Sequence, residues 1–173
     1  VEWDAVELPS QFMENWAWHP EGIALISRHV DTGETLPERM LQSMLAAKNF
    51  QSGMQTLRQL EFALFDLLLH AKTPAPDYPQ LLALLDSVRA DVSIMPTASY
   101  NRFANGFSHI FAGGYAAGYY SYKWAELLSA DAFSQFEETS IFDKNAGKSF
   151  RDNIFPKGGS QSAKANFEAF RGR

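Results

Sequence analysis

Apolar residues recur along most of this 173-residue chain at the three- and four-residue spacing of amphipathic helices, and no segment shows the two-residue alternation of a strand. The spacing predicts helices over residues 9–18, 20–29, 38–48, 52–71, 115–138, 144–153 and 162–170, and one more that begins at Asp77. Between residues 92 and 106 the pattern is irregular. The predicted fold class is therefore all-α, with a multi-helix arrangement in a chain long enough to bury a sizeable core.

Several of the predicted helix starts carry capping signals. Pro9 suits a first turn, because the first helical positions do not need their N–H groups. Thr35 followed by Glu38 reads as a capping box with a proline in the first turn, and Asp77 is a favoured N-cap residue. In the helix predicted over residues 52–71, five leucines share one stripe. They are Leu57, Leu60, Leu64, Leu67 and Leu68.

Composition then narrows the class of protein. The chain is 46% hydrophobic and 14% aromatic, which is typical of a packed globular protein and not of a disordered one. Its formal net charge of -5 argues against nucleic acid as a partner. There is no cysteine, and no apolar run approaches the roughly 20 residues of a membrane span. We therefore predict no nucleic-acid partner, no membrane partner and a cytoplasmic location.

Most of the candidate chemistry lies in residues 107–124. His109 is followed by Gly113 and Gly114, and glycine lets a backbone adopt angles closed to other residues and approach a ligand closely. Three tyrosines then occur at the i, i+4, i+7 spacing of one helix face. They are Tyr115, Tyr119 and Tyr122. Hydroxyl donors beside a histidine and a flexible loop suit a site that grips a peptide and stabilises a developing oxyanion.

The residue patterns alone also allow purely structural roles for these candidate residues. Tyrosines at helical spacing usually form an aromatic core stripe, and a lone histidine before Ile110 and Phe111 is more often a buried, hydrogen-bonded core residue. Asp4 and Glu7 match a capping box. Against a simple core stripe, phenylalanine and leucine are abundant in this chain, yet tyrosine occurs three times directly after the glycine bend.

Three stretches of the chain closely resemble one protein family. They are residues 107–124, the opening string Glu-Trp-Asp-Ala-Val-Glu-Leu-Pro-Ser-Gln at residues 2–11, and the closing string Phe-Glu-Ala-Phe-Arg-Gly-Arg at residues 167–173. In the same order, they resemble the zinc oligopeptidases of the thimet oligopeptidase, neurolysin and oligopeptidase A family, and the bacterial oligopeptidase A branch is nearest in sequence. The resemblance spans essentially all 173 residues.

The resemblance implies a zinc cofactor. Glu7, within Glu-Leu-Pro-Ser-Gln, is similar to the family's third zinc ligand. Glu14 lies seven residues on, near the same helix face, where it could hydrogen-bond to the ligands and orient them. A solvated or structurally paired glutamate is the alternative interpretation of Glu14. The family's other two ligands and its general base come from an HExxH motif, which does not occur in this chain. We therefore expect residues 1–173 to be a single C-terminal helical fragment of a zincin-type oligopeptidase that does not retain zinc by itself.

The resemblance also assigns the loop residues. It implies that His109, Tyr115 and Tyr122 contact the substrate and the tetrahedral intermediate. The residues similar to the family's substrate-binding groups are Tyr119, Gly113 and Gly114.

Taken with Glu7, these residues predict part of a zinc metallo-oligopeptidase that hydrolyses short unstructured peptides. Its expected partners are those peptides and the missing N-terminal part of the same enzyme. The alternative is a non-catalytic helical domain that binds peptides or another protein.

Overall fold

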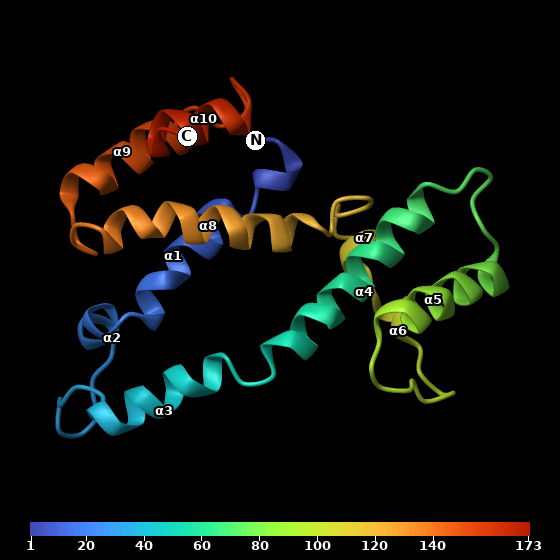
Figure 1. Ribbon diagram of the computed structural model, residues 1–173, viewed down its shortest axis with the longest axis horizontal. Coiled ribbons are helices and arrows are strands. Elements are labelled where there is room, and N and C mark those ends of the chain that lie inside the picture. The colour runs from blue at the N-terminus through green and yellow to red at the C-terminus, as the bar shows by residue number, and fades with distance from the viewer. The chain divides into compact units, whose positions relative to one another are not determined.

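The computed structural model describes residues 1–173, which form helices, turns and irregular segments without any β-strand (Figure 1). The helices are η1 (Trp3–Ala5, a 3₁₀ helix), α1 (Leu8–Trp18), α2 (Pro20–Ile26), α3 (Glu38–Lys48), α4 (Ser52–His70), α5 (Tyr78–Val92), α6 (Phe103–Gly106), α7 (Ser108–Phe111), α8 (Ser121–Glu137), α9 (Lys144–Ile154) and α10 (Ala163–Arg171). The predicted all-α fold class is confirmed. None of these helices is both long enough and apolar enough to cross a membrane.

The capping predictions had mixed outcomes. Asp77 caps α5 with a complete capping box, because its carboxylate accepts the N–H of Gln80 at 2.9 Å while the Gln80 side chain accepts the N–H of Asp77 at 3.0 Å. The capping box predicted at Thr35 is wrong. Pro37 occupies the N-cap position of α3, so Glu38 is the first helical residue and Thr35 lies outside the helix.

The chain divides into two compact units. The first unit consists of Val1–Phe50 and Trp124–Arg173, and the second unit is Gln51–Lys123. The first unit therefore contains η1, α1, α2, α3, α9, α10 and most of α8, whereas the second contains α4 to α7 and the turn that leads into α8.

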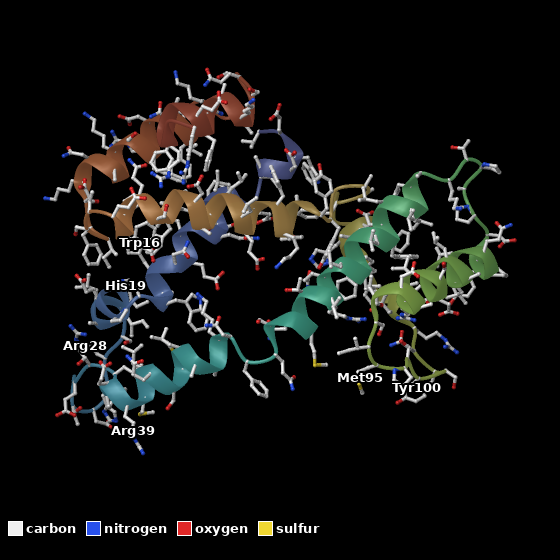
Figure 2. All side chains as sticks on the ribbon, in the orientation of Figure 1. Trp16, His19, Arg28, Arg39, Met95 and Tyr100 are labelled. Carbon is white, nitrogen blue, oxygen red and sulfur yellow. The ribbon has the colours of Figure 1, made fainter.

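Aromatic side chains dominate the core of the first unit. Phe12 of α1 stacks on Phe150 of α9 with ring centroids 3.9 Å apart, and Trp16, labelled in Figure 2, meets Phe133 of α8 edge to face at 4.9 Å. The buried members of this core are Leu8, Phe12, Ala132, Phe133, Phe136, Ile141, Ala146, Phe150, Phe167 and Phe170. Offset and edge-on aromatic pairs stabilise a core beyond their area burial, so α1 is held firmly in the unit that carries Glu7.

In the second unit, α4 packs along α5, as Figure 1 shows. Four of the five leucines predicted to share one stripe of α4 are 38% to 43% exposed. They are Leu60, Leu64, Leu67 and Leu68. The buried face of α4 instead carries Ala63, Phe65 and Leu69, together with two acids, Glu61 and Asp66. Apolar spacing identifies an apolar face, but only the neighbouring elements determine which face of a helix is packed.

Candidate functional site

The candidate site is built around a glycine bend that follows the short helix α7. His109 lies on α7, and the N–H of Gly113 returns to the backbone oxygen of Ser108 at 2.7 Å. A Cβ at Gly113 would lie 3.0 Å from both the Cα and the backbone oxygen of His109, so a larger residue would press on the histidine backbone. Gly114 has φ 84°, in the left-handed region that glycine adopts without strain. Both glycines are therefore required by the shape of the bend.

The chain does not enter the next helix directly after the bend. Residues 116–120 form a turn and α8 begins only at Ser121, so the helix predicted from residue 115 is wrong over its first turns. The cause is Ala117, whose φ of 56° is left-handed. This conformation costs a non-glycine residue about 1–2 kcal/mol, and neighbouring contacts must offset that cost.

Those contacts come from Asp66 of α4. Its fully buried carboxylate accepts the N–H of Ala117 at Oδ1 and the N–H of Tyr119 at Oδ2, both at 2.9 Å. Nδ1 of His70, one turn further along α4, lies 2.9 Å from Oδ1 of Asp66. Asp66 was not among the predicted site residues, although a lone acid between Phe65 and Leu67 indicates a carboxylate with a buried partner.

The turn gathers all three tyrosine rings around His109. The ring centroid of His109 lies 6.0 Å from that of Tyr115, 5.7 Å from that of Tyr119 and 6.1 Å from that of Tyr122. The rings of Tyr115 and Tyr122 stack at 5.0 Å with their planes 25° apart. The four residues predicted from the sequence are thus close together, but a turn brings them there and not the face of one helix.

The three phenols differ in their exposure. Tyr119 is only 8% exposed, and its hydroxyl donates to Oε1 of Gln59 at 3.1 Å. Burial, followed by the neighbouring Tyr122, raises the pKa of Tyr119, while Arg58 opposes the shift. Tyr115 and Tyr122 are half-buried and His109 is exposed. Tyr119 therefore helps to build the cluster from within, and the other three residues form its more accessible side.

Glu7 belongs to the first unit, where it is the half-buried N-cap residue of α1. Its side chain does not cap the helix, and Asp4 lies inside η1, so the capping-box interpretation of Asp4 and Glu7 is wrong. Oε2 of Glu7 instead accepts a hydrogen bond from the Ser10 hydroxyl at 2.8 Å. A hydroxyl that orients a carboxylate in this way is the kind of support that metal-binding carboxylates receive.

The remaining candidate, Glu14, lies two turns along α1 from Glu7 and is exposed. Its Oε1 accepts a hydrogen bond from Nε1 of Trp18 at 3.1 Å. No group of three His, Cys, Asp or Glu side chains in the chain is close enough to hold a metal ion. A catalytic zinc site needs three protein ligands and an open position, so Glu7 can supply one of those ligands and this chain alone does not complete the set.

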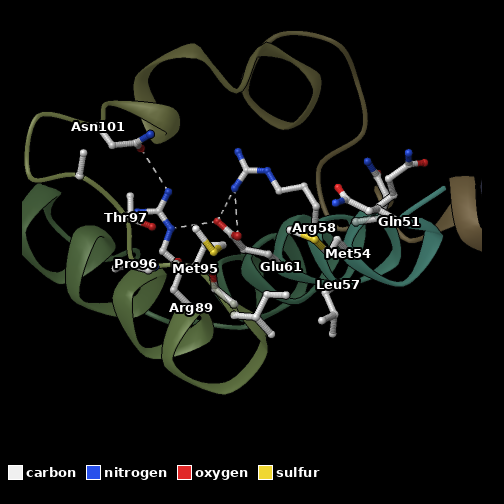
Figure 3. A pocket seen from close by; sticks show the side chains of 15 residues that line it. Gln51, Met54, Leu57, Arg58, Glu61, Arg89, Met95, Pro96, Thr97 and Asn101 are labelled. Carbon is white, nitrogen blue, oxygen red and sulfur yellow. Dashed lines mark hydrogen bonds and ion pairs between the residues drawn. The ribbon is translucent and has the colours of Figure 1, made fainter.

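A separate cavity of about 750 Å³ lies in the second unit (Figure 3). On its wall, the buried carboxylate of Glu61 accepts hydrogen bonds from Arg58 and from Nε of Arg89, each at 2.9 Å. Nη2 of Arg89 also donates to Oδ1 of Asn101 at 3.2 Å. The group was not predicted from the sequence, because Arg58 and Glu61 are three residues apart and match an ordinary surface pair, while Arg89 lies 28 residues from Glu61. The arginines are engaged with Glu61, so the group stabilises the packing of α4 against α5.

Comparison with known proteins identifies the family. Residues 1–173 match the model described as Peptidase family M3, and the chain belongs to this family. It is 56% identical over 173 residues to Oligopeptidase A of Escherichia coli (strain K12), a match that covers all of this chain and 25% of that protein. The resemblance stated from the sequence motifs is thereby confirmed.

Two further relatives widen the comparison. The chain is 49% identical over 177 residues to Probable cytosolic oligopeptidase A of Arabidopsis thaliana, and this match covers 100% of the chain and 25% of the relative. It is 34% identical over 175 residues to Dipeptidyl carboxypeptidase of Salmonella typhimurium, with 98% of the chain and 25% of the relative covered. The chain thus spans about a quarter of the length of the curated relatives it matches.

Proposed function

We propose that this chain works as the C-terminal quarter of a zinc metallo-oligopeptidase that hydrolyses short unstructured peptides. The observation that carries the proposal is the cluster of His109, Tyr115 and Tyr122 beside a glycine bend, in a chain of peptidase family M3. We use the term full-length enzyme for the protein in which this chain follows an N-terminal part that contains the family's HExxH motif.

The roles follow from the chemistry of these side chains. A phenol O–H and an imidazole N–H are hydrogen-bond donors, and a donor aimed at an oxygen that gains charge in the transition state accelerates acyl transfer. We assign Tyr115, Tyr122 and His109 to this task, and Gly113 and Gly114 to the close approach of a peptide backbone. Tyr119 is buried and holds the cluster together, and we also assign it, by the family resemblance, to the grip on the peptide backbone.

Glu7 would hold zinc together with the two histidines of the upstream motif, whose glutamate would be the general base. When bound, zinc polarises a peptide carbonyl and activates a water molecule at neutral pH. The Glu7 carboxylate fits this task, because it is half-buried, does not cap its helix and is oriented by the Ser10 hydroxyl. Glu14 would support the ligands from further along α1. We place the enzyme in the cytoplasm, with peptides as its substrates.

The test compares the isolated chain with the full-length enzyme on a quenched fluorogenic peptide, with and without a chelator. We expect chelator-sensitive hydrolysis by the full-length enzyme only. A second peptide with a blocked carboxyl terminus separates an endopeptidase, which still cleaves it, from a dipeptidyl carboxypeptidase, which does not. A full-length enzyme that cleaves neither peptide would contradict the proposal and favour a non-catalytic binding domain.

Metal analysis of the isolated chain after dialysis completes the test. One carboxylate cannot replace three ligands, so we expect zinc well below one ion per chain. Stoichiometric zinc in the isolated chain would show that a different set of ligands binds the metal.

A further inference from the structure

Asp66 is a buried carboxylate to which the proposed peptide hydrolysis assigns no role. It lies on α4 with no exposed surface, while both of its oxygens accept hydrogen bonds from a segment about 50 residues further along the chain. Burying a carboxylate is costly unless hydrogen bonds satisfy it, and each half of this carboxylate is satisfied by a backbone N–H of the turn that precedes α8. The location of Asp66 is therefore explained by this turn and not by its own helix.

The two donors lie on either side of Gly118, so Asp66 holds the middle of the turn. Ala117, the first donor, is the residue with left-handed φ, and Tyr119, the second, belongs to the ring cluster. Directly before the turn, the N–H of Tyr115 donates to the backbone oxygen of His109 at 2.9 Å. The turn is thus attached to α7 at one end and to α4 at its centre, and these attachments set where the three tyrosine rings lie relative to His109.

His70 locks the Asp66 side chain. Its Nδ1 lies 2.9 Å from Oδ1 and 2.8 Å from the backbone oxygen of Asp66. Both of these atoms are acceptors, so Nδ1 carries a proton and donates. The side chain of His70 is 30% exposed, so it closes the Asp66 site from the solvent side.

We infer that Asp66 is the positioning residue of the tyrosine cluster: through Ala117 and Tyr119 it holds the turn that places Tyr115, Tyr122 and His109 for the reaction, and His70 keeps its carboxylate in place. The expected effect of Asp66 on catalysis rests on the proposed function. The expected effect of Asp66 on the conformation of the turn is independent of the proposed function, because it depends only on the hydrogen bonds to Ala117 and Tyr119.

The variant that tests it is Asp66→Asn in the full-length enzyme. An asparagine keeps one acceptor oxygen and turns an amide N–H₂ toward the second backbone donor, so one of the two hydrogen bonds is lost. A reacting group misplaced by about 1 Å can cost on the order of 10²-fold in rate, so we expect kcat to fall about 10- to 100-fold while KM changes little. Deuterium exchange of the backbone amides in residues 115–121 should accelerate, with the remaining helices unchanged.

Glu61→Gln is the matched control. Glu61 is also a buried acid on α4, only 3% exposed, but its carboxylate accepts hydrogen bonds from Arg58 and Arg89 and not from the turn. It should lower the thermal midpoint while exchange in residues 115–121 and kcat stay near wild type. If Asp66→Asn does not fold, His70→Ala, at a partly exposed position, should give a smaller acceleration of exchange in the same segment.

The outcomes separate the two proposals. Unchanged exchange in residues 115–121 for the folded Asp66→Asn or His70→Ala variant would overturn the positioning role, whatever the activity. An equal loss of kcat in Glu61→Gln and Asp66→Asn would also overturn it, because the loss would then reflect stability alone. If instead exchange accelerates but Tyr122→Phe has wild-type kcat, Asp66 positions the turn and the catalytic assignment of the tyrosines fails.

Discussion

The indole Nε1 of Trp16 donates a hydrogen bond to the backbone oxygen of Ile141 at 2.8 Å, although 125 positions separate the two residues. Trp16 lies near the end of α1, and Ile141 is a buried residue of the segment after α8. Asn15 makes a second such link, since its Nδ2 donates to Oγ of Ser129 in α8 at 2.9 Å. The helix that begins next to Glu7 is therefore fixed by polar as well as aromatic contacts.

Gly22→Ala should destabilise the first unit. A Cβ at Gly22 would lie 1.9 Å from the backbone oxygen of Trp16, which is too close for any side chain, so α2 must move away from α1. Overpacking of this kind costs about 1–3 kcal/mol. Gly147→Ala, inside α9 with open space around it, is the control and should be neutral or stabilising by roughly 0.5–1 kcal/mol. Thermal unfolding of both variants measures the difference, and equal midpoints would contradict the close approach.

Glu7→Ala and Glu7→Gln in the full-length enzyme should each remove zinc and activity together, because neither side chain supplies a carboxylate ligand. Zinc content after dialysis and peptide hydrolysis are the measurements. Full zinc occupancy in either variant would show that Glu7 is not a ligand.

Glu14→Gln in the full-length enzyme tests whether Glu14 supports the zinc ligands. Loss of a supporting hydrogen bond typically weakens metal affinity by about 10- to 100-fold, and we expect a decrease in zinc affinity of this size. Unchanged affinity would leave Glu14 as the acceptor of the Trp18 indole.

Tyr122→Phe should lower kcat by about 10²- to 10³-fold with little change in KM, because the lost donor acts only in the transition state. Tyr115→Phe should behave similarly. Tyr120→Phe is the control, since it removes a phenol from the same turn at a position that is 38% exposed. If the tyrosines are only packing groups, phenylalanine would fill nearly the same volume and all three variants would keep wild-type kcat with small shifts in thermal midpoint.

Arg171→Ala should destabilise the packing of α10 on α8. The guanidinium of Arg171, 11% exposed, donates to Oδ1 of Asp131 at 3.0 Å, to Oγ of Ser134 at 2.8 Å and to Oε1 of Glu138 at 2.9 Å. Hydrogen bonds to charged groups contribute about 1.5–3 kcal/mol, so the thermal midpoint at pH 7 should fall measurably. Arg151→Ala, which removes an exposed pair with Asp152, is the control and should leave the midpoint unchanged.

The effect of Arg171 should depend on pH. The hydrogen bond from Arg173, followed by the one from Arg171, holds the pKa of Asp131 below its usual range, although partial burial opposes this. A lowered folded-state pKa means that ionised Asp131 stabilises the fold above its unfolded pKa of about 3.9, and that this stability is lost as the pH falls through the folded value. The gap between the wild type and Arg171→Ala should therefore narrow below about pH 4. A constant gap from pH 7 to pH 3 would contradict the role of Asp131.

The candidate residues were predictable to different degrees. His109, Tyr115, Tyr119 and Tyr122 could be found because they are concentrated in one short segment beside the glycine bend. Their arrangement could not, because the periodicity of the tyrosines matches a helix, and only the left-handed Ala117 shows that the segment is a turn. Asp66 carried one local signal, its position between Phe65 and Leu67, but its partners could not be predicted. An acid four residues before a histidine on a helix is usually a surface pair, and the backbone donors lie more than 50 residues away.

The sequence by itself determined the helical class of the chain, the start of most helices and the family. Apolar spacing, the Asp77 cap and the glycine bend are local signals, and they depend on residues a few positions apart. Tertiary structure decided which face of α4 is buried and how residues 115–120 turn. Both depend on groups far apart in sequence, such as the Ala117 N–H and the Asp66 carboxylate 51 positions away. A buried carboxylate that accepts two backbone N–H groups can outweigh the helical spacing of the three tyrosines, and a pattern of neighbouring residues does not reveal hydrogen bonds to such a distant group.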